Sequence, residues 1–315
     1  VTVVPALRKI NNPDLRQLQY VNFKGSFTGF IRDFVTFGTI QTALGTIATD
    51  INMKLPAGQV PVYSGKIATN NFQLGKLLSD KSLGVISMKG TVKGKGFNFK
   101  NVNTLLDGTI QFADYNGYRY ENITVNGKLE KKLFEGVASV KDKNADLVLN
   151  GIIDFNGPAP RFNLIADIKK ADFKSLNLTK DSLGFVGKLN FNFTSNSIDN
   201  FVGEARIPEA EIIKGNLKIH FDSLVITAVD IDGGRKLTVL SNEFDGTFTG
   251  DFNLTDLPGS FTYLLNKYYP AYIAAPNKVP KNQDISFDIK TYYINDYLQI
   301  LSPAIQGFNN STLQG

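Results

Sequence analysis

Cysteine and tryptophan are absent from this chain of 315 residues, and histidine occurs only once. Without cysteine, the chain can form no disulfide, thiolate nucleophile or zinc–thiolate site. The one histidine, His220, stands on the polar side of an alternating strand between Ile219 and Phe221. No partner nucleophile accompanies it, so the pattern favours an exposed strand histidine over a catalytic base.

Long apolar runs are also missing, since no segment reaches the roughly 18 consecutive apolar residues that indicate a membrane-spanning helix. The first ten residues resemble neither a signal peptide nor an initiating segment with Met. We therefore expect the chain to be a piece of a longer protein. The absence of cysteine is compatible with a periplasmic as well as a cytosolic location.

Charged residues of one sign do not cluster in any segment of the chain. The formal net charge is +5, from 34 Lys and Arg against 29 Asp and Glu. The cations are spread singly along the chain without a run of five, so nucleic-acid binding is not indicated.

Three short motifs could suggest chemistry, and each has a simpler interpretation. The glycines from Gly90 to Gly96 precede no helix that could hold a phosphate. Asp230 and Asp232 lack the downstream glutamate of a calcium loop and favour a hairpin turn. Scattered carboxylates such as Glu209 are typical of turns and surfaces. The sequence thus predicts no enzyme, no metal site and no cofactor.

Strand and turn formers dominate what is present, with 24 Phe, 12 Tyr and 28 Gly. Most of the chain alternates between apolar and polar residues, as in Ile86, Met88 and Val92 against Lys89 and Lys93. The spacing of turns predicts about 16 to 20 antiparallel strands. One face of each strand is expected to be apolar and the other polar.

A near-repeat about one hundred residues long supports a repeating β-structure. Leu83-Gly84-Val85-Ile86 and Leu183-Gly184-Phe185-Val186 each open a strand. An apolar strand and a short link precede each of them, at Tyr63 to Thr69 and at Phe162 to Lys169. Repeated supersecondary order is typical of a stacked or extended sheet.

Glycine often replaces the apolar residue on the apolar face, which predicts strong curvature toward that face. Two arrangements then remain open: a closed sandwich in which two sheets bury these faces, and an open trough lined by them. For the trough, the residues expected to line a lipid-binding groove are Ile86, Met88, Val92, Ile123, Val125, Leu147, Leu149, Leu164, Phe185, Leu189, Phe191, Leu217, Ile219, Phe244 and Phe248.

Helix is predicted in one main place, from Pro258 to Tyr269, where apolar residues recur at helical spacing before Pro270. The expected organisation is a repeating β-groove segment over 1–257, with near-repeats at about 60–160 and 161–257. A capping helix follows over 258–273, and a loop, a further strand and a tail over 274–315. The expected fold is mainly β: an elongated, strongly curved antiparallel sheet forming an open groove.

Strand and turn motifs over Val3 to Ile273 resemble a known family in their order rather than individually. They are Val21-Asn22-Phe23-Lys24-Gly25-Ser26-Phe27-Thr28-Gly29-Phe30, Gly45-Thr46-Ile47-Ala48-Thr49-Asp50-Ile51, Met53-Lys54-Leu55-Pro56, Tyr63-Ser64-Gly65, Asn71-Phe72-Gln73-Leu74-Gly75-Lys76-Leu77-Leu78, Leu106-Asp107-Gly108-Thr109-Ile110, Asn116-Gly117-Tyr118, Lys131-Lys132-Leu133-Phe134, Asn177-Leu178-Thr179, Ser241-Asn242-Glu243-Phe244, Gly250-Asp251-Phe252 and Leu265-Asn266-Lys267-Tyr268-Tyr269-Pro270. In this order they resemble TamB and its AsmA-like relatives, in the form found in Bacteroidetes.

The resemblance implies a protein of the bacterial periplasm and cell envelope, anchored in the inner membrane through a region absent from this chain. It implies a β-taco groove that carries phospholipid toward the outer membrane by sheltering its acyl chains. It also implies an Omp85-type outer-membrane partner, TamA, although the family's C-terminal region that engages this partner is not evident here. An alternative role is a scaffold or chaperone whose edge strands pair with nascent outer-membrane proteins.

Overall fold

The computed structural model describes residues 17–98, 100–180, 182–268, 270–271, 274–276, 283–295, 297 and 307–315. Strands account for 64% of the structure and helices for 7%, which confirms the predicted mainly β class. The 18 strands belong to one open antiparallel sheet. Because the strands of the described residues all belong to this one sheet, the alternative of two sheets packed face to face is wrong.

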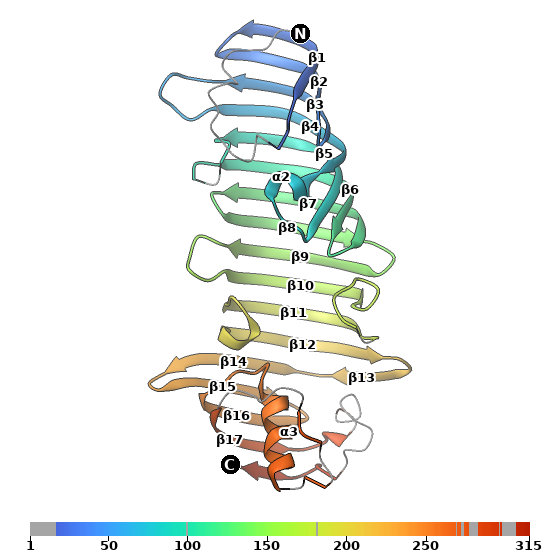
Figure 1. Cartoon of the computed structure of the whole chain (residues 1–315), viewed down its shortest axis with the longest axis vertical. Coiled ribbons are helices and arrows are strands. Elements are labelled where there is room, and N and C mark those ends of the chain that lie inside the picture. The colour runs from blue at the N-terminus through green and yellow to red at the C-terminus, as the bar shows by residue number, and fades with distance from the viewer. Residues whose placement is uncertain are drawn as a thin grey trace. The chain divides into compact units, whose positions relative to one another are not determined.

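The strands follow the alternating segments of the sequence (Figure 1). Their bounds are β1 Val21–Phe30, β2 Asp33–Thr42, β3 Gly45–Lys54, β4 Val62–Gln73, β5 Leu83–Lys95, β6 Asn103–Tyr115, β7 Tyr118–Glu130, β8 Leu133–Lys141, β9 Ala145–Asp154, β10 Arg161–Asp172, β11 Gly184–Thr194, β12 Val202–Lys214, β13 Leu217–Phe221, β14 Leu224–Ile231, β15 Gly234–Ser241, β16 Phe244–Asp251, β17 Asp284–Thr291 and β18 Thr312–Gln314. The expected C-terminal tail thus contributes a short strand that pairs with β17.

The helical segments whose bounds are described are α2 Leu74–Leu78, η2 Ile198–Asn200 and α3 Leu257–Tyr268. In the described residues α3 is the only helix of seven or more residues, and it lies where the sequence predicted one. Pro270, predicted to stop it, follows closely. Tyr269 and residues 272–273 of the expected capping segment, and residues 277–282, 296 and 298–306 of the loop, strand and tail region, lie outside the described residues.

Two compact units divide the chain. Unit 1 comprises Val1–Asn156 and Ala166–Phe185, and unit 2 comprises Gly157–Ile165 and Val186–Gly315. In unit 1, the strands from β1 to β9 pair each with the next in antiparallel register. In unit 2, β12 pairs with both β13 and β14, and the strands from β14 to β18 pair in sequence.

Both copies of the near-repeat have a link between two strands, and both links lie in unit 1. The two links differ in structure. The link before Leu83 forms α2, whereas the link before Leu183 forms a hydrogen-bonded turn. In that turn the Leu176 amide donates to the Asp172 carbonyl at 3.0 Å, and the Leu176 side chain is buried. Each link therefore places an apolar group at the end of a strand before the chain reverses.

Candidate functional site

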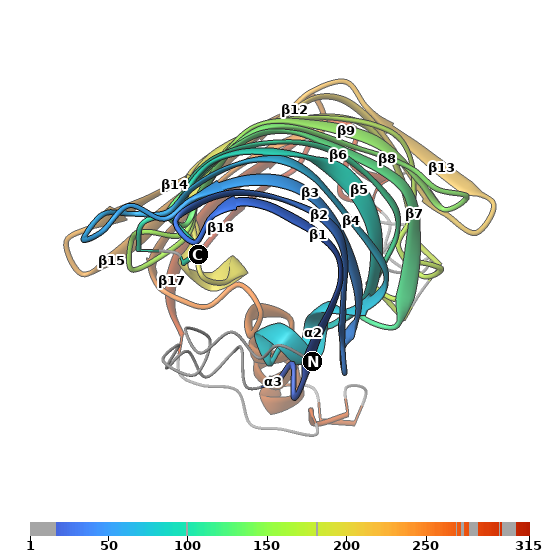
Figure 2. The same ribbon diagram turned by 90° about the horizontal axis from the view of Figure 1, so that it is seen from above.

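The inner face of unit 1 is the face of its sheet that α2 packs against. Figure 2 shows α2 on the inner side of the curved strands. The helix residues Leu74 and Leu77 pack in the same cluster as Ile47, Met88 and Ile110. Those three residues stand in one cross-strand row, so the register identifies every other residue on this face.

Followed from β2 to β9, the inner face carries no charged side chain at the paired positions in the body of the sheet. Its residues are Phe34, Thr36, Gly38, Ile40, Ile47, Thr49, Ile51, Met53, Tyr63, Gly65, Ile67, Thr69, Met88, Gly90, Val92, Gly94, Thr104, Leu106, Gly108, Ile110, Ile123, Val125, Gly127, Leu129, Phe134, Gly136, Ala138, Val140, Leu147, Leu149, Gly151 and Ile153. An uncharged surface of this extent on one side of a sheet is suited to apolar matter rather than to a charged substrate.

Most of these side chains are neither buried nor fully exposed. Val92, Leu106 and Val125 are all half-buried, and among the inner-face residues only Thr49 and Thr104 are buried. Neighbouring side chains and the curvature of the sheet shelter them, but no second sheet in the described part of the chain covers them. The inner face of unit 1 is therefore a partly sheltered apolar surface, which is consistent with a groove-like fold.

Glycine allows adjacent strands to approach closely on this face. A Cβ atom added to Gly127 would lie 2.5 Å from the Glu135 carbonyl oxygen and 2.9 Å from Cα of Gly136, which is directly opposite. Any side chain at Gly127 would push the strands apart. The curvature that the sequence predicted from its glycines thus has a steric cause.

The helix α2 covers one edge of the inner face. Leu44, Phe72 and Ile86 are buried there beneath Leu74 and Leu77. The register between β4 and β5 shifts between Thr69 and Phe72, which brings Phe72 opposite Ile86. Ile86, predicted to line an open groove, is instead part of this small closed cluster.

The outer face of unit 1 is not as uniformly polar as the sequence suggested. It carries lysines such as Lys66 and Lys89, but also several apolar side chains that are exposed to solvent. These are Val35, Phe37, Leu105, Val137 and Val148. Val and Phe favour strands whether or not they are buried, so alternation alone overstated the contrast between the faces.

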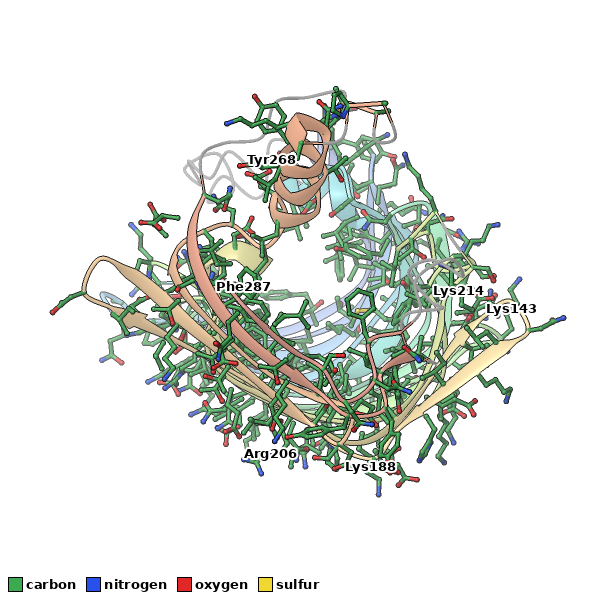
Figure 3. The ribbon with its side chains drawn as sticks, turned by 90° about the horizontal axis from the view of Figure 1, so that it is seen from below. Lys143, Lys188, Arg206, Lys214, Tyr268 and Phe287 are labelled. Atoms are coloured by element: carbon green, nitrogen blue, oxygen red, sulfur yellow. The ribbon has the colours of Figure 1, made fainter. Side chains whose placement is uncertain are left out.

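The inner face of unit 2 is covered rather than open. Ala228, Leu237, Val239 and Phe252 form a buried cluster, and Leu257 at the start of α3 packs against it. Figure 3 shows Phe287 on the inner side, whereas Lys188 and Arg206 project from the outer side. Unit 2 therefore uses its apolar face to build a hydrophobic core.

An aromatic series extends this core along unit 2. The ring of Phe193 lies 5.1 Å from that of Phe162 and 5.0 Å from that of Phe201, which in turn packs against the core. The Phe191 ring meets Phe193 edge to face at 5.4 Å. These contacts stabilise the strands by stacking as well as by burial.

Arg235 is the one strongly basic group that is buried in this region of the described chain. Its guanidinium donates to the backbone carbonyls of Asp199 and Phe201, the latter at 2.9 Å, and lies over the ring of Phe252. The Asp199 carboxylate in turn accepts hydrogen bonds from the amide and hydroxyl of Thr255, which lower the pKa of Asp199. These contacts tie η2 to the segment that leads into α3.

Apart from Ile86, which is buried under α2, the predicted lining residues separate into three groups. Met88, Val92, Ile123, Val125, Leu147 and Leu149 lie on the inner face of unit 1. Phe244 and Phe248 pack on the core of unit 2, and Ile219 is 5% exposed. Leu164, Phe185, Leu189, Phe191 and Leu217 are half-buried in β10, β11 and β13.

Sequence reasoning missed the inner-face residues of β2, β3, β6 and β8, among them Ile51, Met53, Leu106 and Phe134. Their strands alternate as clearly as the others, so counting every second residue from each turn could have found them. The interleaved Thr and Gly residues obscured the apolar character of these strands.

Three ion pairs of unit 1 lie near the ends of its strands: Lys54 with Asp33, Arg119 with Asp114, and Lys128 with Glu130. Lys128 donates a hydrogen bond to Glu130, and this bond, with the fields of Lys131 and Lys95, holds the pKa of Glu130 below its ordinary value. At the opposite ends, Arg119 forms an ion pair with Asp114 at 2.7 Å, and this hydrogen bond lowers the pKa of Asp114.

A buried polar cluster joins the β6–β7 and β8–β9 turns. The hydroxyl of Tyr118 donates to the Asp142 carboxylate, which also accepts from the Asn144 amide at 2.8 Å. Burial, and then the hydrogen bond to Asp142, raise the pKa of Tyr118 to about 12. The second carboxylate oxygen of Asp142 is buried and has no hydrogen-bond partner among the described residues.

Material for metal or acid–base chemistry is sparse in the described part of the chain. It contains no group of three or more His, Asp or Glu side chains that could hold a metal ion. His220 lies 3.3 Å from Asp222, and both side chains are more than half exposed. A hollow of about 690 Å³ crosses β4 to β8. Its lining includes consecutive strand residues of both alternating positions, such as Thr109 and Ile110, and also Lys89.

Comparison with protein-family models, with curated proteins and with solved structures found no match for this chain. Within the residues described, none of the helices has the length and apolar character needed to cross a membrane.

Proposed function

We propose that the inner face of unit 1 shelters the acyl chains of phospholipid and conducts lipid between the inner and outer membranes of a bacterial cell envelope. The observation that carries this proposal is the uncharged, half-buried face that runs across β2 to β9. No bond is made or broken in this role, which agrees with the scarcity of catalytic groups. The resemblance to TamB and its AsmA-like relatives supports a periplasmic location and an anchor outside this chain.

The energetics suit reversible lipid binding. Each methylene removed from water contributes about 0.8 kcal/mol, so a partly sheltered acyl chain is held by several kilocalories per mole. The contacts are diffuse and have no directional hydrogen bonds, because no charged group and few polar groups stand on the inner face. A chain can therefore slide from strand to strand without losing a specific bond.

Two neighbouring residues of β6 provide a matched test. Leu106 lies on the inner face, whereas Leu105 lies on the outer face and is 56% exposed. Leu106→Asp is expected to remove phospholipid that copurifies with the protein, and Leu105→Asp is expected to leave it unchanged. Native mass spectrometry and lipid extraction measure the difference.

A second variant separates loss of lipid from loss of folding. Val92→Thr and Val125→Thr keep strand-forming residues and add hydroxyl groups to the inner face. Combined, they should weaken lipid binding while the circular dichroism spectrum stays unchanged. Equal lipid content in the Leu105 and Leu106 variants, or none in the wild type after gentle purification, would show the proposal to be wrong.

A second role has support from β1. Every residue of this strand is exposed, and its described partner is β2 alone. Phe23, Phe27 and Phe30 add apolar side chains to this edge. Such an edge can accept an extended segment of another protein, which favours the alternative of a scaffold for outer-membrane proteins with an Omp85-type partner.

The two roles respond differently to a proline in β1. If strand pairing is the function, Ser26→Pro should abolish binding of extended outer-membrane-protein peptides, measured by fluorescence anisotropy, without changing lipid content. Peptide binding that survives this substitution would argue against the scaffold role.

A further inference from the structure

The charges of unit 1 are unevenly divided between the two ends of its strands. The basic rim consists of the turns at 31–32, 55–61, 96–98 with 100–102, and 131–132, together with the two strand residues on each side of every turn. Alternate hairpins of an antiparallel sheet place these turns along one edge (Figure 1). The opposite rim consists of residues 43–44, 74–82, 116–117 and 142–144 with their flanking residues.

Cations predominate on the basic rim. Its described residues include six cations, Arg32, Lys54, Lys95, Lys100, Lys131 and Lys132, and two anions, Asp33 and Glu130. On the opposite rim, by the same definition, five cations are offset by four anions. The two edges of the same apolar face therefore present different electrostatic environments.

Both acids of the basic rim are already paired. Asp33 accepts from Lys54 at 3.3 Å, and Glu130 accepts from Lys128. Arg32, Lys95, Lys100, Lys131 and Lys132 are all exposed, and none of them forms a hydrogen bond or ion pair with a side chain of the described residues. This rim therefore presents cationic side chains that can bind an external anion.

The unpaired lysines lie at the edge of the apolar face. Lys95 stands opposite Asn103, which stands opposite Glu130, at the end of β5, the start of β6 and the end of β7. One residue further in, Gly94, Thr104 and Leu129 form a row of the inner face. One residue along a strand spans about 3.3 Å, and successive side chains point to opposite faces, so Lys95 borders that row from the outer register. Lys131 and Lys132 stand in the turn that follows β7, so these three lysines lie at the edge of the inner face rather than on it.

We infer that the basic rim of unit 1 binds the phosphate of anionic phospholipids whose acyl chains lie on the adjacent inner face. This inference rests on the proposed function and adds the lipid class and the edge at which the headgroup lies. A zwitterionic headgroup carries its own cation and gains less from this rim. An anionic headgroup complements the unpaired lysines, and neighbouring hairpins, about 10 Å apart, offer it successive sites along the sheet.

The opposite rim is less suited to this role. Of its four carboxylates, Asp114 is paired with Arg119, and Asp80 and Asp142 accept hydrogen bonds from the uncharged Ser82 and Tyr118, so most of its negative charge stays beside its lysines. The helix α2 also covers part of the face beside this rim. A headgroup at that edge would meet both signs of charge and a closed apolar cluster.

The test compares charge reversal on the two rims in the full chain. The variant K95E/K131E/K132E alters the basic rim, and K76E/K81E/K143E alters three exposed lysines of the opposite rim. Each protein is incubated with vesicles of phosphatidylcholine and phosphatidylglycerol in equal parts, and the lipid it removes is identified by mass spectrometry. Vesicles that contain diacylglycerol provide a lipid without a phosphate.

We expect the wild type to take phosphatidylglycerol in preference to phosphatidylcholine. The basic-rim variant should lose this preference by about tenfold, since each lysine near an anionic lipid contributes severalfold. The opposite-rim variant should keep it, and uptake of diacylglycerol should stay unchanged in both. The preference should also fall as salt screens the charges, and excess inorganic phosphate should compete poorly because it has no acyl chain.

Lipid uptake without anionic preference, or an equal effect of the two variants, would overturn the inference while leaving the proposed function intact. Absence of lipid from the wild type would overturn both. Strong competition by inorganic phosphate would show that the rim binds free phosphate rather than a lipid headgroup.

Discussion

The two units share the same alternating pattern of apolar and polar residues but use the apolar face differently. In unit 2, Ala228 and Leu237 are 0% and 5% exposed, because α3 and its approach cover the apolar face. In unit 1, Leu106 and Val125 stand at equivalent alternating positions but stay half-buried, because α2 covers only one edge. An apolar strand face therefore becomes a core or an accessible surface according to what lies above it.

The largest effect should come from placing a charge in the closed core. Leu237→Asp is expected to destabilise unit 2 by about 3 to 5 kcal/mol, because the carboxylate would be buried without a partner. Leu106→Asp in unit 1 should cost much less, because its site is partly open to water. Hydrogen exchange resolved by peptide reports the stability of each unit. Similar losses in the two variants would show that the inner face of unit 1 is also a closed core.

A smaller effect is expected where glycine permits close approach in unit 1. Gly127→Ala should destabilise the sheet by about 2 kcal/mol, because its Cβ would meet the Glu135 carbonyl oxygen at 2.5 Å. Gly108→Ala is the matched control, since its nearest contact, the Lys89 carbonyl oxygen, is 2.9 Å away and leaves more room. Urea denaturation gives both values. The steric explanation of the curvature fails if Gly127→Ala is no worse than Gly108→Ala.

Unit 1 should also be sensitive to alkali through Tyr118, whose pKa is raised from 10.0 to about 12. The folded state holds this proton more tightly than the unfolded state, so the stabilisation is fully present below pH 10 and is lost as the pH rises to 12. Tyr118→Phe should cost about 1 kcal/mol at neutral pH and should remove this alkaline loss. Ultraviolet titration of the tyrosines and thermal melting at several pH values measure this loss of stability. If the variant still loses stability over the same alkaline range, another group is responsible for the loss.

The smallest effect should be a gain in unit 2. Gly259 lies in α3, and a Cβ added there would meet no heavy atom within 4 Å. Gly259→Ala is expected to stabilise unit 2 by about 0.5 kcal/mol, because alanine favours the helix more than glycine does. Thermal denaturation detects the shift, and unit 1 should not respond. A loss of stability would mean that α3 needs the freedom of glycine at this position.

Individual elements show how far the sequence could be interpreted. The helix α3 and the strand β5 were predictable because their apolar residues follow periods that no distant contact needed to supply. Met88, Val92 and Val125 share one face of the sheet for the same reason. Ile86 was not, because the register shift between β4 and β5 and the helix above it are decided by long-range packing.

The strands, the turns and the residues that share a face follow from the sequence alone, because side chains alternate strictly along an extended backbone. The close approach of strands at the glycines follows from it as well. Only the tertiary structure decided that a single sheet forms, that α3 closes the face of unit 2, and that α2 leaves most of the inner face of unit 1 uncovered. The reason is that alternation specifies which side of a strand is apolar, whereas what covers that side depends on segments far away in the chain.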